Sequence, residues 1–130
     1  MNEIRIPISP GELLDKITIL QIKAERIDDP AKVANVRTEL DMLQKVWTES
    51  VEDDDEIRAL SAELKSINEA LWVIEDDIRD EERNKRFGER FIELARAVYV
   101  TNDERANAKK QVNLHLNSAI VEEKSYQDYR

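Results

Sequence analysis

Three polar residues interrupt the apolar side of the last long helical pattern in this sequence. Apolar residues recur at helical spacing from Phe91 to Leu116. At about 100° of rotation per residue, Asn102, Arg105 and Lys109 fall on the same side of that helix. The pattern therefore predicts an amide, a guanidinium and an ammonium group inside the protein. A buried charge costs stability unless a partner lies beside it.

A carboxylate on another helix is the expected partner of these cations. Glu75 lies at the edge of the apolar face of the preceding helical segment. In an antiparallel hairpin, however, Arg105 would lie about two helical turns beyond the level of Glu75. Asp15, Lys16 and Lys23 of the first helical segment are therefore further candidates for the same cluster.

Two interpretations of this cluster follow from its chemistry. In the first, the charges form a closed network of ion pairs that fixes how the helices align. In the second, they line a pocket between helices that binds an anionic small molecule. The residues of this hypothetical ligand site are Lys16, Glu75, Asn102, Arg105 and Lys109.

An acid-dense stretch near the end of the third helical segment offers a separate hypothesis. Asp76 and Asp80 are four residues apart, as are Asp77 and Glu81, so either pair could hold Mg²⁺. We favour an exposed acidic face beside a basic helix, because the segment that follows is rich in bases. The sequence therefore predicts no metal and no cofactor.

Other catalytic chemistries lack the residues they need. The chain has no cysteine and one histidine, His115, which excludes disulfides, thiolate nucleophiles and histidine-rich metal sites. His115 has no evident acid–base partner in the sequence, and no glycine-rich phosphate loop is present. The formal net charge of −9 disfavours nucleic acid or an anionic membrane as the main partner.

Long helices must position these residues, because the 130-residue chain contains only two glycines and three prolines. Ser9 and Pro10 carry the signature of a helix start, and Glu12 would complete a capping box. We expect an all-α fold, a single helical-bundle domain over residues 1–130. The predicted helices span residues 10–27, 30–49, 55–82 and 88–116.

The third predicted helix has the most regular apolar pattern. Spacings of three and four residues alternate over three heptads, as in a coiled-coil seam. Segment 52–82 holds thirteen acids and three bases, whereas segment 83–110 holds four acids and eight bases. A hairpin that bends at about Gly88 would place these opposite charges side by side. The seam residues are Ile57, Leu60, Leu64, Ile67, Leu71, Ile74 and Ile78.

The first two helices have contrasting patterns. The first is apolar on more than one side, so it should be the central helix of the bundle. The second should pack through one face only. The residues of that face are Val33, Val36, Leu40, Leu43 and Trp47.

The two ends of the chain contain further apolar residues. Residues 3–8 alternate apolar and polar side chains, which predicts a short extended segment or edge strand. The C-terminal tail could dock on the bundle through Ile120, Val121, Tyr126 and Tyr129. No apolar run approaches the roughly 20 residues of a membrane helix, and the first residues do not read as a signal peptide. We therefore expect a cytoplasmic protein.

Four stretches carry a resemblance that extends over most of the chain: GELLDKITILQIKAERI (11–27), LWVIEDDIR (71–79), FIELARAVYVTNDERANAKKQVN (91–113) and VEEKSYQDY (121–129). They resemble a family of small helical proteins of unknown function from bacteria and some phages. The resemblance implies an all-α fold but no activity, substrate or catalytic residue, and segment 30–56 matches least. The stretches contain Asp15, Lys16, Glu75, Asp76, Asn102, Asp103, Arg105, Lys109 and Lys124.

We predict a non-catalytic helical module whose role is association, with itself or with another protein. The heptad seam and the edge-like N-terminal segment favour this function, and we expect a homodimer. The alternative is a protein that binds an anionic metabolite or nucleotide between its helices, or a small helical enzyme. The two differ in whether the cations converge on an open cavity or end in closed ion pairs.

Overall fold

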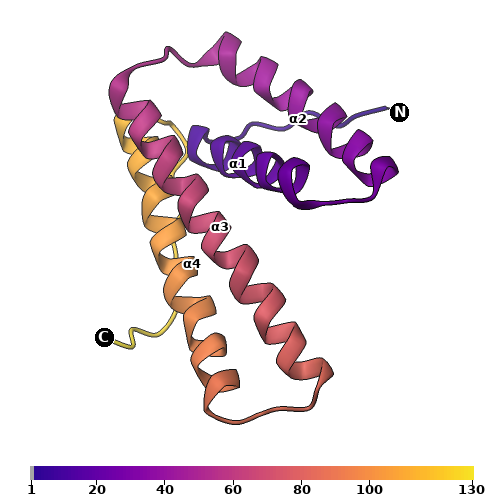
Figure 1. Cartoon of the computed structure of the whole chain (residues 1–130). Helices are drawn as coiled ribbons and strands as arrows, with labels where there is room; N and C mark the ends of the chain where they lie inside the picture. Colours follow the sequence, from indigo (N-terminus) through magenta and orange to yellow (C-terminus); the bar gives the residue numbers. More distant parts are fainter. Residues whose placement is uncertain (1) are drawn as a thin grey trace.

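Four helices make up the fold in a computed structural model that describes residues 2–130. They are α1 (Pro10–Arg26), α2 (Pro30–Ser50), α3 (Asp55–Arg83) and α4 (Glu89–His115). Helices α3 and α4 form a long antiparallel hairpin, and α1 crosses one half of it while α2 packs on α1 (Figure 1). The predicted all-α fold is confirmed, and each predicted helix boundary lies within one residue of the observed one.

Side-chain caps fix where three of the helices begin. The side chains of Ser9, Asp29 and Asp54 accept hydrogen bonds from backbone N–H groups in the first turns of α1, α2 and α3. Prolines occupy the first positions of α1 and α2, where their missing N–H has no intrahelical partner to lose. Only half of the predicted capping box forms, because the Glu12 carboxylate lies against Lys109 of α4 instead.

Helix α1 is the central helix, as its pattern predicts. It contacts α2, α3 and α4, and it contributes the buried side chains Leu13, Leu14, Ile17, Leu20 and Ile22. Helix α2 contains no buried residue, but all five residues of its predicted face are half-buried. It is therefore held through one face, on α1.

The turn between α3 and α4 is a Schellman motif. The N–H of Arg86 bonds to the carbonyl of Glu81, and the N–H of Lys85 bonds to that of Glu82. The residue in the left-handed conformation is Lys85, with φ of 56°, whereas Gly88 has negative φ and open space around it. The predicted bend is thus found close to Gly88, but the glycine does not produce it.

The N-terminal segment does not form the strand that its alternation predicts. Residues 2–9 are irregular, and no strand occurs within residues 2–130. Ile4 and Ile6 are 79% and 69% exposed. An isolated alternating segment has no sheet edge to pair with in an all-helical protein, so it stays extended and unpaired. Within the same residues, no helix is long and apolar enough to cross a membrane.

The half of the α3–α4 hairpin beyond α1 has no third helix on it (Figure 1). We call residues 72–100, which form this half, the distal hairpin. Its single buried residue is Leu94, whereas residues 57–71 of α3 contain five buried residues. Seam residues Ile74 and Ile78 are half-buried because only α4 covers them.

Candidate functional site

A buried carboxylate lies at the junction of α1, α3 and α4. Asp15 of α1 is 1% exposed, and its carboxylate accepts two hydrogen bonds from the Arg105 guanidinium of α4, one of them from Nε at 2.9 Å. Asn68 of α3 donates from Nδ2 to the same carboxylate at 2.9 Å and to the Thr18 hydroxyl at 3.0 Å. The Thr18 hydroxyl donates to the backbone carbonyl of Asp15. These bonds join the three helices.

Asp15 is held in its ionised form. Burial alone would raise the pKa of its carboxyl group, because it disfavours the charge. Hydrogen bonds from Arg105 and Asn68 and the charges of Arg105 and Lys109 outweigh this effect, so the pKa of Asp15 lies below its ordinary value. The hydrogen bond that Arg105 donates to the ionised Asp15 raises the pKa of Arg105.

Lys109 connects α4 to α1 and to the C-terminal tail. Its ammonium lies 2.6 Å from a Glu12 carboxylate oxygen, 3.3 Å from one of Glu122 and 3.9 Å from one of Asp15. Burial would lower the pKa of Lys109, but the Glu12 hydrogen bond and the surrounding carboxylates raise it overall. The side chain of Lys109 is 12% exposed, and three acids surround its charge.

A close backbone contact lies one turn beyond Lys109. The N–H of Gly11, in the first turn of α1, donates to Asn113 Oδ1 of α4 at 2.7 Å. A Cβ at position 11 would lie 2.4 Å from the Lys109 carbonyl oxygen. Sequence reasoning missed this pair. The sequence feature that indicates this contact is a glycine in the first turn of a helix, where no turn of the chain requires glycine.

The other predicted members of the cluster lie apart from the buried carboxylate. Glu75 pairs with Arg79 on the same helix, so the expected Glu75–Arg105 pair does not form and Asp15 takes its place. Lys16 is exposed on α1 and lies 3.8 Å from Glu12. Arg105 was expected to lie about two helical turns beyond the level of Glu75, and this separation explains why the two side chains do not form an ion pair.

A groove of about 470 Å³ opens beside the network, where α1 stops covering the hairpin. It brings together three of the five predicted ligand-site residues, Glu75, Asn102 and Arg105. Ile19 of α1 and the aromatic residue Trp72 of α3 also line it. We call this space the junction groove; its remaining lining residues are Asn68, Leu71, Asp76 and Arg79.

The junction groove is close to balanced in charge. The buried Asp15 carboxylate neutralises the charge of Arg105, and Glu75 forms an ion pair with Arg79. The carboxylate of Asp76 makes no ion pair with any residue of 2–130. The groove therefore offers an apolar wall, two amides and one uncompensated negative charge, rather than a concentration of positive charge.

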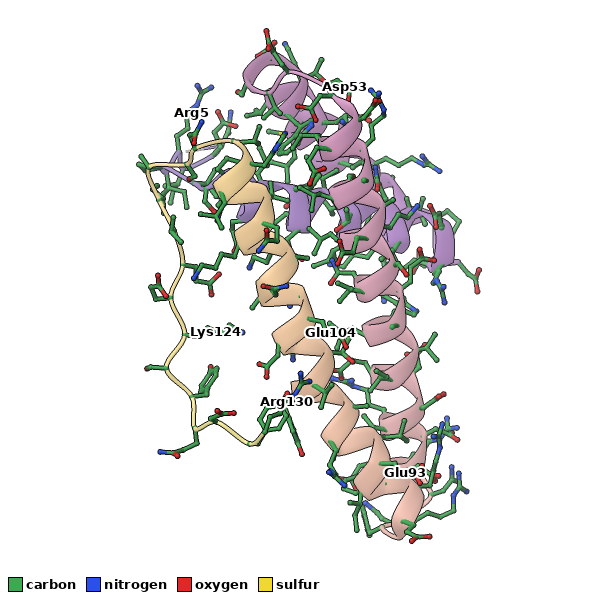
Figure 2. The ribbon with its side chains drawn as sticks, turned by 90° about the vertical axis from the view of Figure 1, so that its left-hand side faces the viewer. Arg5, Asp53, Glu93, Glu104, Lys124 and Arg130 are labelled. Carbon is green, nitrogen blue, oxygen red and sulfur yellow. The ribbon has the colours of Figure 1, made fainter. Side chains whose placement is uncertain are left out.

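A second hollow lies between α4 and the C-terminal tail. The tail runs back along α4 from its end to Arg130 (Figure 2). Tyr129 stacks edge-on against Tyr99 with 4.9 Å between ring centroids, which docks one of the predicted tail residues. A hydrogen bond to Asp103 raises the pKa of Tyr129. Asp103 and Lys124 line this hollow of about 520 Å³.

The acid-dense stretch of α3 is matched by bases. Asp77 pairs with Arg90, Asp80 with Arg83 and Arg86, and Glu81 with Arg86. No group of three or more potential ligands for a metal ion gathers among residues 2–130. These acids therefore lie in ion pairs with bases of the turn and of the start of α4, and the Glu81 side chain is 13% exposed.

His115 has a partner that its sequence position does not reveal. Its Nε2 lies 3.0 Å from an oxygen of Asp54, the residue that caps α3. The Ile57 N–H and His115 lower the pKa of Asp54. Because this pair ties the end of α4 to the start of α3 at the surface, we assign it to the fold.

A family model covers almost the whole chain. Residues 4–129 match a family of unknown function (DUF6165). No curated protein and no solved structure matches the chain.

Proposed function

Because the chain belongs to this family of unknown function, its role has to come from its geometry, and we propose that it is a helical association module. It pairs with a second copy of itself through the distal hairpin. The observation that carries this proposal is the half of the hairpin that protrudes beyond α1 with no further helix on it, although the C-terminal tail contacts it at Tyr99 (Figures 1 and 2).

The exposed surface of the chain is large for its mass. The accessible area is 9223 Å², whereas a compact monomer of 15.2 kDa would expose ~7,100 Å². The two irregular ends contribute part of the excess, and the distal hairpin contributes another part. A typical stable interface removes ~800 Å² from each partner, so pairing of two chains would remove part of this excess.

The distal hairpin continues the face on which α1 packs. One stripe of α4 contains Phe91, Ala95 and Val98 as well as Lys109. Helix α1 covers this stripe at Lys109, where Glu12 contacts the ammonium group. Phe91, Ala95 and Val98 are half-buried, and Phe87 beside them is 51% exposed. An apolar stripe that is covered over half its length favours a further helix over the other half.

Charge favours a second copy as the partner. Residues 72–83 of α3 hold six acids and two bases, and residues 85–100 hold two acids and four bases. When two such hairpins pair about a two-fold axis that runs along their helices, the acidic helix of each faces the basic helix of the other. The surface is therefore self-complementary, as a two-fold interface requires.

The test is a mass measurement by light scattering on matched variants. Val98→Glu places a charge on the uncovered stripe and should leave a monomer. Leu114→Glu changes a residue that is 54% exposed at the opposite end of the hairpin, and it should leave the dimer intact. Equal masses for the two variants would contradict the proposal, provided that circular dichroism shows both to be folded.

An anionic ligand is the second candidate that the sequence raised. The junction groove favours some small molecule there, since it collects Glu75, Asn102 and Arg105. The ion pairs of Arg105 and Lys109 favour the closed network instead, because little positive charge remains for an anion. Thermal-shift assays with phosphate, sulfate and nucleotides test this candidate, and we expect no stabilisation.

The cellular setting is part of the proposal. The absence of cysteine agrees with a reducing compartment such as the cytosol, where disulfides are rare. Fractionation of cells that express the protein tests this location. The bacterial or phage source implied by the sequence resemblance stays a prediction.

A further inference from the structure

The amide of Asn68 uses only its nitrogen inside the protein. Asn68 is 5% exposed, and its Nδ2 donates one hydrogen bond to the Asp15 carboxylate and one to the Thr18 hydroxyl. An ionised carboxylate only accepts hydrogen bonds, so Asp15 fixes which end of the amide is the nitrogen. The Oδ1 atom of Asn68 accepts no hydrogen bond from residues 2–130.

This oxygen opens into the junction groove. Among residues 2–130, no fully buried side-chain nitrogen or oxygen lacks a hydrogen-bond partner. Because Oδ1 of Asn68 has no partner, it must reach the solvent, and the hollow that Asn68 lines is the junction groove. The groove therefore contains an acceptor that a buried network holds in place and that no donor of the described chain satisfies.

Asp76 supplies a second acceptor in the same groove. Its side chain is exposed and forms no ion pair within residues 2–130. The other charges of the groove are paired, Arg105 with Asp15 and Arg79 with Glu75. The charge that remains is negative, in a chain whose formal net charge is −9. This balance favours a cationic ligand.

The two acceptors lie at different heights on α3. Asp76 comes eight positions after Asn68, a separation of ~12 Å along the helix axis. Leu71 and Trp72 lie between them in the sequence and line the same groove. One small ion cannot contact both acceptors across this distance, whereas an elongated molecule with an apolar middle can.

The dimensions of the groove suit such a molecule. Its volume of about 470 Å³ falls within the ~300–1,000 Å³ of small-molecule sites. Ile19, Leu71 and Trp72 provide the apolar surface that would contact the body of a bound chain. The few polar groups would then fix its two ends.

We propose that the junction groove binds an elongated organic amine. The ammonium group pairs with Asp76, the apolar body lies over Leu71 and Trp72, and a neutral donor such as a hydroxyl or amide at the far end bonds to Oδ1 of Asn68. A neutral group suits that end because the Arg105 guanidinium lies beside it, on the same Asp15 oxygen. The site belongs to one chain and does not depend on the proposed self-association.

Titration with aminohexanol tests the site. This probe has an ammonium group at one end of its chain and a hydroxyl at the other. Trp72 reports binding by fluorescence in a Trp47→Phe background, where it is the only tryptophan. We expect a saturable change in Trp72 emission at millimolar probe. Ethanolamine is too short to reach both acceptors and should give no saturation over the same range.

Two further probes each lack one end group. Hexanol lacks the charge and should bind about threefold more weakly than aminohexanol, the effect of one exposed ion pair. Hexylamine lacks the hydroxyl, so it would cover Oδ1 of Asn68 without satisfying it. It should bind about tenfold more weakly, because a covered acceptor without a donor is costly.

A matched pair of variants tests the protein side. Asp76→Asn keeps the size of the side chain and removes its charge, so it should weaken aminohexanol about threefold and leave hexanol unchanged. Asp41→Asn removes the same charge from an exposed position of α2, a helix that contacts α1 only. This control should leave both affinities unchanged.

The contrary results are equally specific. The inference is overturned if Trp72 gives no saturable response to aminohexanol, if the three six-carbon probes bind equally, or if Asp76→Asn and Asp41→Asn behave alike. Mass measurements decide self-association separately. A monomeric chain that binds aminohexanol as described would support this site and contradict only the proposed pairing.

Discussion

At the residue scale, one carboxylate organises the junction of three helices. Asp15 is 1% exposed and receives hydrogen bonds from Arg105 and Asn68. The sequence identified the buried cations of α4, because they interrupt an apolar stripe. It did not identify Asp15 as the main partner, because a helical pattern gives the face of a residue but not its height against another helix.

Removal of Arg105 tests the closed network. Arg105→Met removes the hydrogen-bonded cation of the buried Asp15 carboxylate and leaves the more distant Lys109 beside it, so the loss should approach the ~3–5 kcal/mol of a broken buried pair. We expect a lower unfolding free energy by urea denaturation and no recovery with phosphate. The matched control is Arg96→Met on the exposed side of α4, which should change stability by less than ~0.5 kcal/mol. A neutral or stabilising Arg105→Met would favour the ligand pocket instead.

The lowered pKa of Asp15 makes the free energy of unfolding depend on pH in the acidic range. Because the folded state lowers this pKa below its ordinary value of 3.8, Asp15 contributes its full stability above that value. The contribution is lost as the pH falls through the folded pKa. Unfolding curves measured between neutral pH and pH 3 should show a smaller acid-dependent loss for Asp15→Asn than for wild type, from a lower starting stability. Parallel curves would show that Asp15 is not the group that titrates.

At the element scale, the helices follow from local chemistry and their contacts do not. Caps at Ser9, Asp29 and Asp54 and the scarcity of glycine made the four helices predictable. Residues 3–8 have the alternation of a strand, but no other strand exists in residues 2–130 to pair with them. Pairing is a property of the whole fold, so alternation in one segment was not sufficient.

Gly11 sets how closely α1 approaches α4. Gly11→Ala brings a Cβ to 2.4 Å from the Lys109 carbonyl oxygen, a backbone atom that cannot move alone. We expect a loss of ~1–3 kcal/mol, the range for overpacked sites, measured by thermal unfolding. Gly88→Ala is the control, since nothing lies within 4 Å of its added Cβ. Equal stability of the Gly11→Ala and Gly88→Ala variants would contradict a close contact between Gly11 and α4.

Lys85, in the turn between α3 and α4, should lower the stability of the monomer. Lys85→Gly removes a left-handed side chain, which costs ~1–2 kcal/mol, so the monomer should gain up to ~1 kcal/mol. That gain is measured in a Val98→Glu background, where the chain is expected to be monomeric. A loss of monomer stability on this substitution would contradict a conformational cost at Lys85.

At the scale of the whole molecule, the sequence did not predict how the four helices are arranged. The heptad seam predicted the hairpin, and a bundle of four helices of similar length would have covered it. The sequence did predict that α1, with 17 residues, is shorter than α3, with 29, but no pattern in it indicated that α2 packs on α1 rather than on the hairpin. The distal hairpin therefore extends past its neighbours with a half-covered apolar stripe and an acidic and a basic edge.

The dependence of the wild-type mass on protein concentration shows whether two copies of the chain associate. Sedimentation equilibrium over micromolar to hundreds of micromolar protein should show the mass rise from 15.2 kDa to a plateau at about twice that value, as two copies bury the distal hairpin. Moderate salt should weaken the pair without abolishing it, since apolar area contributes as well as charge. A mass that stays at 15.2 kDa throughout would contradict the account.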